Sequence, residues 1–211
     1  MPNIQLFYWL DSSSVACHIL LYETGLPFEA VQIQPTEESF AALRKLNPKA
    51  RIPTLAIDGK VITETQAIMT AIAQLAPAKH LFGKNDLEAV RVHEWLGWLV
   101  GTFHGQAWVP VFRPERFSDD TSQHEAIRAK GLATLKELYR MLEEKVIGAY
   151  AVGDEFTAAD AFLYVLFRWG SKWKIVNKRS QPNFCHAMMD FQERAAVKKV
   201  LDVEHLQAVD V

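Results

Sequence analysis

The chain has 211 residues and a formal net charge of −2, and its basic residues form no block, which argues against nucleic acid or an anionic membrane as a partner. Its two cysteines, Cys17 and Cys185, form no CxxC pair, which argues against a disulfide framework, a zinc site or a dithiol redox motif. The N-terminus has no charged leader with an apolar core, and no apolar run approaches the roughly 20 residues of a membrane span. We therefore expect a cytoplasmic protein without a bound metal.

The first 77 residues predict alternating strands and helices. Ser12–Ser14 precede an apolar-periodic run that stops at Gly25, a pattern typical of a helix with a serine N-cap and a glycine at its end. Asp58-Gly59 lies between two short apolar runs and predicts a β-hairpin. The expected strands cover 4–9, 28–33 and both arms of this hairpin, and the expected helices cover 14–25, 36–46 and 64–76. The order is β-α-β-α-β-β-α, in which the first helix provides the crossover that parallel strands require.

Strand signals disappear after a predicted linker over residues 78–85. Thr157 and Asp160 have the spacing of a capping box, with aspartate in place of the usual glutamate, and mark the start of one helix. Helices are also expected over 87–109, 119–146, 182–195 and 197–207. We therefore predict two domains, 1–77 and 86–211, of which the second is entirely helical.

The stretch from Asn47 to Thr65 carries the clearest functional signal. The peptide bond between a residue and a following proline adopts the cis form at low energetic cost, so the Ile52-Pro53 bond can be cis. A cis bond there would turn the Ile52 N–H and C=O outward to pair with a peptide-like ligand. Glu64 offers a carboxylate for an amine, and Thr65 offers a hydroxyl and free N–H groups at a helix start for a carboxylate. Together these groups fit a small zwitterionic peptide.

Four segments in this order and spacing resemble the soluble glutathione transferases over essentially the whole chain. They are the first helix from Ser14 to Gly25, the loop from Leu46 to Leu55, the start of a helix from Thr63 to Ile68, and the capping-box helix from Phe156 to Leu163. The resemblance implies a thioredoxin-like N-terminal domain, an all-helical C-terminal domain, glutathione as co-substrate, and a homodimer. His18 to Gly25, and Glu94-Trp95-Leu96 with His104, are similar to the bacterial beta class.

The resemblance also implies the active-site residues. Ser13 stands where the beta class has a cysteine near the glutathione sulfur, and Ser14 follows it. We expect Ser14 to stabilise the glutathione thiolate, with Ser13 and Ser12 as alternatives. Gly97 replaces the asparagine that this class has seven residues before its histidine.

Glutathione binding is expected from Ile52, Pro53, Glu64, Thr65, Arg51 and His104, with Arg44 or Lys45 as alternatives to Arg51. An apolar pocket for the electrophile is expected from Trp9, Trp108, Phe112, Trp169 and Trp173. The predicted reaction is conjugation of the glutathione thiolate to a hydrophobic electrophile. Two alternatives stay open: another glutathione-dependent reaction (peroxide reduction, isomerisation or reductive cleavage), and a binding protein that keeps the fold without catalysis. Serine rather than cysteine at positions 12 to 14 disfavours mixed-disulfide chemistry.

Overall fold

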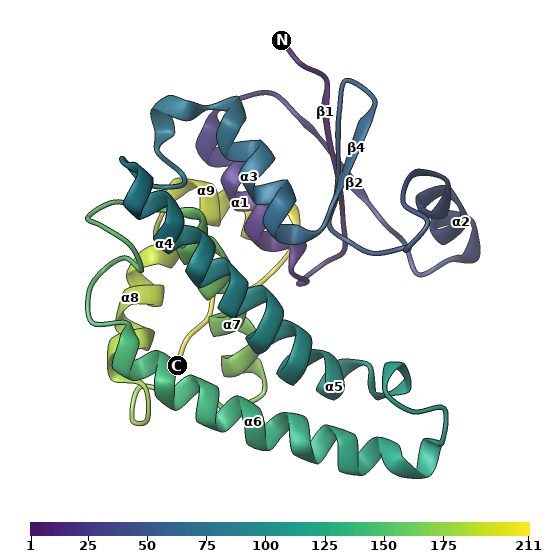
Figure 1. Cartoon of the computed structure of the whole chain (residues 1–211), viewed down its shortest axis with the longest axis vertical. Helices are drawn as coiled ribbons and strands as arrows, with labels where there is room; N and C mark the ends of the chain where they lie inside the picture. Colours follow the sequence, from purple (N-terminus) through teal and green to yellow (C-terminus); the bar gives the residue numbers. More distant parts are fainter.

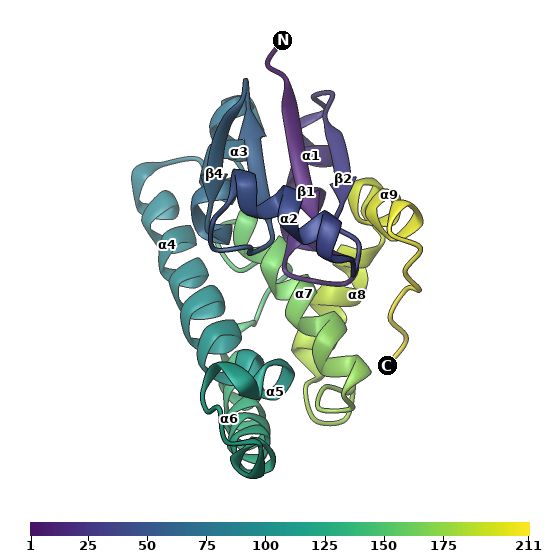
Figure 2. The same cartoon turned by 90° about the vertical axis from the view of Figure 1, so that its right-hand side faces the viewer.

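The computed structural model describes residues 1–211 and begins with a four-stranded sheet of order β2-β1-β3-β4. β2 runs parallel to β1, and β3 and β4 are antiparallel to their neighbours. α1 and α3 lie on one face of the sheet and α2 on the other (Figures 1 and 2). The elements are β1 (Ile4–Tyr8), α1 (Ser14–Thr24), β2 (Glu29–Gln32), α2 (Glu37–Leu46), β3 (Thr54–Ile57), β4 (Lys60–Thr63) and α3 (Thr65–Leu75).

This order confirms the predicted β-α-β-α-β-β-α unit. The hairpin turn has Asp58 at φ 50° and Gly59 at φ 75°, the left-handed pair that a two-residue turn between twisted strands requires. Gly25 ends α1 in the left-handed conformation at φ 71°, as glycine allows. The predicted serine cap on α1 comes from Ser12, whose Oγ accepts a hydrogen bond from the Ser14 N–H at 3.2 Å. Ser13 occupies the N-cap position, but its side chain makes no capping hydrogen bond.

The remainder of the chain is helical. Residues 86–112 form one continuous helical run, slightly longer than predicted, made of α4 (Asp86–Leu96), a π-helical stretch η2 (Gly97–Trp108) and α5 (Val109–Phe112). After two short 3₁₀ turns come α6 (His124–Lys145), α7 (Ala158–Lys172), α8 (Pro182–Gln192) and α9 (Ala195–Val203). The last two helices end three and four residues earlier than predicted. The division into two domains stays a prediction.

α7 lies at the centre of the molecule and joins its two halves. Nearly all of its residues are buried, and it packs against α1, α4 and α8. Its predicted capping box is present: the Asp160 carboxylate accepts hydrogen bonds from the Thr157 backbone N–H at 2.8 Å and from the Ala151 N–H at 2.7 Å. None of the helices has the length and apolar content needed to cross a membrane.

Candidate functional site

Three segments of the chain lie at the same end of strands β1, β3 and β4. Phe7 of β1 pairs with Thr54 of β3, and Thr54 pairs with Thr63 of β4. The residues just beyond these pairs are therefore neighbours: the serine loop that follows β1, Ile52-Pro53 before β3, and Glu64 after β4. The register of the strands thus brings together the groups that the sequence singled out.

The serine loop presents its three hydroxyls in different ways. The Ser14 Oγ–H donates to the Trp9 carbonyl at 3.1 Å, its oxygen lies 2.7 Å from Ser12 Oγ, and its side chain is fully buried. Ser13 is 5% exposed and has no capping partner. The geometry therefore argues against Ser14 as the residue that stabilises the thiolate, because the Ser14 hydroxyl already donates its hydrogen bond to the Trp9 carbonyl.

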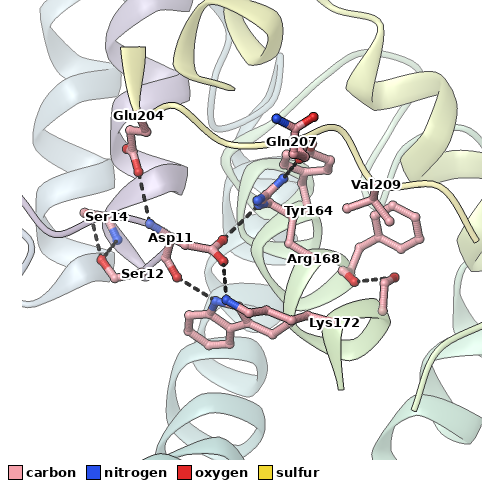
Figure 3. A network of polar contacts seen from close by, with 12 residues as sticks. Asp11, Ser12, Ser14, Tyr164, Arg168, Lys172, Glu204, Gln207 and Val209 are labelled. Carbon is pink, nitrogen blue, oxygen red and sulfur yellow. Dashed lines mark hydrogen bonds and ion pairs between the residues drawn. The ribbon is translucent and has the colours of Figure 1, made fainter. Parts of the chain in front are cut away.

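Asp11 fixes the serine loop to the C-terminal half of the chain (Figure 3). Its carboxylate lies 3.0 Å from Arg168 Nε and 3.3 Å from Lys172 Nζ, and its carbonyl accepts a hydrogen bond from Trp169 Nε1 at 2.9 Å. Asp11 has a φ of 52°, a backbone conformation that few residues other than glycine adopt. These contacts hold the turn that positions Ser12 to Ser14.

A second anchor comes from the end of the chain. Glu204 Oε2 accepts a hydrogen bond from the Asp11 N–H at 3.2 Å, and Oε1 lies 2.9 Å from Nδ1 of His18 in α1. Both Glu204 and His18 are almost completely buried. The sequence analysis missed Asp11 and Glu204 as parts of the site, since their partners lie more than 150 residues away in the chain.

Asn47 organises the loop that carries Ile52. Its side-chain amide donates to the Arg51 carbonyl at 2.9 Å and to Thr54 Oγ1 at 3.0 Å, and Asn47 is fully buried. The Ile52–Pro53 bond is cis, as predicted. The Ile52 N–H and C=O make no hydrogen bond within the chain, so they are available to a peptide ligand.

Glu64 and Thr65 begin α3. Glu64 is exposed and has a φ of 71°, and strained backbones of this kind cluster at functional sites. Its carboxylate is paired with Lys49, which also donates to Thr63 Oγ1 at 2.9 Å. Thr65 is the first residue of the helix, where backbone N–H groups lack helical partners. Lys49 lies in the stretch that the sequence singled out, but its role there was missed.

His104 lies in an aromatic environment on η2. Its ring is 5.3 Å from that of Trp169, and burial, followed by the charge of Arg116, lowers its pKa to about 4. It is therefore neutral at pH 7.

The predicted electrophile pocket is only partly assembled. Phe112 lies 4.9 Å from Trp108 and 5.3 Å from Trp169, measured between ring centroids. Trp108 is fully buried, so it forms the layer behind Phe112, whereas Trp173 is 43% exposed and offers an open face. Trp9 belongs to a different contact: its ring packs against Phe40 on α2, with centroids 5.9 Å apart.

No group of three or more histidine, cysteine, aspartate or glutamate side chains is arranged to hold a metal ion. Cys17 is fully buried, which raises the pKa of its thiol and makes it a packing residue rather than a nucleophile.

Family models match both parts of the chain: residues 6–80 match the N-terminal domain of glutathione S-transferases, and residues 92–195 match their C-terminal domain. The chain belongs to the glutathione S-transferase family. It is 28% identical to glutathione S-transferase GstA of Escherichia coli O157:H7, over 97% of this chain and 100% of that protein.

Solved structures of this family have the same fold. A glutathione transferase homologue from Sulfitobacter with bound glutathione superposes with a TM-score of 0.90 at 26% identity, over 98% of this chain and 100% of that one. A beta-class glutathione S-transferase from Sphingomonas chungbukensis has a TM-score of 0.82 at 27% identity, over 96% of this chain and 100% of that one. The predicted family and fold class are confirmed.

Proposed function

We propose that this glutathione S-transferase conjugates the thiolate of glutathione to a small electrophile, with the Ser13 hydroxyl donating a hydrogen bond to the sulfur. The observation that carries the serine assignment is the difference between neighbouring hydroxyls. Ser14 donates to the Trp9 carbonyl, whereas Ser13 has no capping partner and stands at the start of α1. Ser13 thus takes the role that the sequence alone favoured for Ser14.

The energy required is modest. A free thiol has a pKa of about 8.5, and lowering it by about two units takes roughly 2.7 kcal/mol of preference for the thiolate. A hydrogen bond to a charged group contributes about 1.5–3 kcal/mol, and the positive end of a helix adds about 0.3–1 kcal/mol. Ser13 and α1 together supply this amount without a general base.

The remaining groups fit glutathione in an extended pose along the sheet edge. The unpaired N–H and C=O of Ile52 pair with the cysteinyl backbone, as a further strand would. The N–H groups at the start of α3, beginning at Thr65, hold the γ-glutamyl carboxylate, and Glu64 holds the amine. Lys49 is paired with Glu64 in the free protein, so binding requires Lys49 to release this carboxylate or to share it.

We also propose a homodimer that forms through α3 and the first turns of α4. Leu87 and Val90 of α4 are 66% and 61% exposed, which is unusual for large apolar side chains spaced one turn apart. The adjoining groove is lined by residues of β4, α3 and α4, namely Ile62, Glu64, Gln66, Ala67, Thr70, Ala71, Gln74 and His93. The groove includes Glu64, so the dimer would form beside the glutathione site.

The test of thiolate activation is a pH titration of the ultraviolet thiolate absorbance of glutathione, with and without the protein. The wild-type protein is expected to lower the pKa of bound glutathione by at least one unit. Ser13→Ala is expected to raise that bound pKa by about one to two units, because one hydrogen bond to the charged sulfur is lost.

Ser14→Ala is the matched control, and the expected change in the bound thiol pKa is small. A raised pKa in Ser14→Ala with none in Ser13→Ala would return the role to Ser14. Wild-type protein that leaves the thiol unshifted would refute thiolate activation and favour a binding protein.

A further inference from the structure

The C-terminal half of the chain holds Asp11 through its N–H, its carbonyl and its carboxylate. Glu204 accepts a hydrogen bond from the Asp11 N–H at 3.2 Å, and Trp169 Nε1 donates to the Asp11 carbonyl at 2.9 Å. The Asp11 carboxylate lies 3.0 Å from Arg168 Nε and 3.3 Å from Lys172 Nζ. Asp11 directly precedes the three serines, so the serine loop is attached to the C-terminal helices at its first residue.

The two cations that face the Asp11 carboxylate differ in burial. The Arg168 side chain is 8% exposed and the Lys172 side chain is 69% exposed. Arg168 also donates through Nη1 to the Gln207 carbonyl at 2.9 Å, and its guanidinium carbon lies 5.9 Å from the centre of the Tyr164 ring. Figure 3 shows Arg168 between Asp11 and Gln207. These contacts fix the Arg168 guanidinium, whereas the exposed Lys172 exchanges the carboxylate for water at little cost.

The pairing of Asp11 with Arg168 has an electrostatic consequence for a thiolate bound at the start of α1. The Asp11 carboxylate is a partly buried anion two residues before Ser13 in the chain. A negative charge near a thiol disfavours the thiolate and raises the pKa of that thiol. The Arg168 guanidinium, 3.0 Å from the carboxylate, cancels most of this field at a group farther from both charges.

We propose that Arg168 is a positioning residue for thiolate activation: it holds the turn from which Ser13 donates, and it neutralises the Asp11 carboxylate. Arg168 acts on the glutathione sulfur through Asp11 and the serine loop, without touching it. This inference rests on the proposed function and adds to it a residue of α7.

An ion pair between the two halves of the chain can also serve stability alone, and Arg194 provides the matched comparison. Its Nε lies 2.8 Å from Glu23 Oε1, and its guanidinium carbon lies 4.6 Å from the centre of the Phe156 ring. Arg194 thus resembles Arg168 in joining the C-terminal half to the N-terminal half. Glu23, however, lies in the last turn of α1, at the far end of a helix about 16 Å long.

The test measures the pKa of the thiol of bound glutathione by ultraviolet absorbance, and kcat/KM with 1-chloro-2,4-dinitrobenzene as the electrophile. In this reaction the sulfur forms a bond to the ring carbon, and chloride leaves with the electron pair of the broken C–Cl bond. Arg168→Gln is expected to raise the bound-thiol pKa by about 0.5 to 1 unit and to lower kcat/KM about three- to tenfold at about pH 6.5.

The pH profile separates positioning from a structural role. At about pH 9.5 the thiol is ionised in both proteins, so the loss of kcat/KM in Arg168→Gln is expected to fall below about twofold. Arg194→Gln is the control and is expected to keep the wild-type thiol pKa and the wild-type pH profile, even if it lowers the Tm.

Two further substitutions test whether Arg168 acts through Asp11. Arg168→Lys keeps the charge but cannot hold Asp11 and Gln207 at once, so less than half of the pKa shift is expected. Asp11→Asn removes the carboxylate charge, and asparagine tolerates the left-handed φ of 52° at this position. In this background Arg168→Gln is expected to raise the thiol pKa by less than half as much. If Arg168→Gln does not fold, Arg168→Lys with and without Asp11→Asn gives the same comparison.

A loss of kcat/KM that is equal at both pH values, with an unchanged thiol pKa, would assign Arg168 to stability alone and overturn the proposal. An equal pKa shift in Arg194→Gln would overturn it too, because any loosened contact between the halves would then affect the thiol. Wild-type protein that leaves the thiol unshifted would remove the proposed function and this inference together. A shifted wild type with an unshifted Arg168→Gln would remove this inference alone.

Discussion

Two adjacent serines illustrate how function is decided by single atoms. Ser13 and Ser14 stand side by side at the start of α1, but the Ser14 Oγ–H donates to Trp9 and the Ser13 hydroxyl does not cap the helix. Asp11, whose φ is 52°, lies in the turn between Trp9 and Ser14 that this hydrogen bond of 3.1 Å spans. A hydroxyl can stabilise the glutathione thiolate only if its hydrogen is not already donated elsewhere. For this reason we propose Ser13, and not the neighbouring Ser14, as the donor to the sulfur.

His104 gives a prediction about pH. Its pKa is about 4 in the folded protein, below the ordinary value near 6.5, so the unfolded chain takes up this proton first as the pH falls. Stability from this group is thus complete above pH 6.5 and is lost as the pH falls toward 4. His104→Gln is expected to flatten the pH dependence of the unfolding free energy between pH 4.5 and 7, measured with urea.

The matched control is His186→Gln, because the His186 side chain is 81% exposed. This variant is expected to keep the wild-type slope. If His104→Gln and wild type lose stability in parallel across this range, burial of the His104 ring does not govern the acid sensitivity of the fold.

At the level of single residues, local signals predicted part of the site and could not predict the rest. Ile52-Pro53 and Glu64-Thr65 were recognisable because the chemistry of each pair is local. Asp11 and Glu204 were not, because their contacts depend on how distant helices pack. The full burial of Trp108 likewise follows from packing, since the spacing of aromatic residues does not distinguish an inner layer from an exposed face.

At the level of elements, the capping box of α7 gives a prediction about stability. Asp160 is fully buried and accepts hydrogen bonds from Ala151 and Thr157. Asp160→Ala leaves these donors without partners and is expected to lower the free energy of unfolding by about 2–4 kcal/mol in urea titration. Thermal unfolding is expected to show a lower Tm as well.

Asp154→Ala is the control for this prediction. Its carboxylate is 82% exposed and paired with Lys84, and surface pairs contribute little, so a change below about 1 kcal/mol is expected. Equal effects of the two substitutions would mean that the capping box does not stabilise α7.

Element types were predictable because hydrophobic periodicity and turn residues agree with each other along this chain. Boundaries were less so: the run over 86–112 extends past the predicted end, and α9 starts at Ala195 rather than Val197. Arg194 is extended at the N-cap of α9 and bonds to Glu23 of α1, a long-range contact that helps set this boundary. Helix ends depend on such contacts more than helix interiors do.

At the scale of the whole molecule, the proposed dimer gives a prediction about assembly. A glutamate at an apolar contact would remain buried and unpaired in the dimer, which is costly. Leu87→Glu together with Val90→Glu is therefore expected to shift the protein from dimer to monomer, measured by size-exclusion chromatography with light scattering at micromolar concentration.

Ile147→Glu is the matched control, because Ile147 is 87% exposed and does not line the groove beside α3 and α4. It is expected to leave the mass unchanged. A wild-type protein that is already monomeric, or a double variant that stays dimeric, would refute assembly through α4.

The bond between Asp11 and Glu204 has a consequence for synthesis on the ribosome. The strand and helix that flank the serine loop emerge first, but the carboxylate that holds the Asp11 N–H is added 193 residues later. The nascent chain therefore cannot form this hydrogen bond until α9 and Glu204 have left the exit tunnel. A chain that ends before Glu204 lacks this anchor and holds Asp11 through Arg168, Lys172 and Trp169 alone.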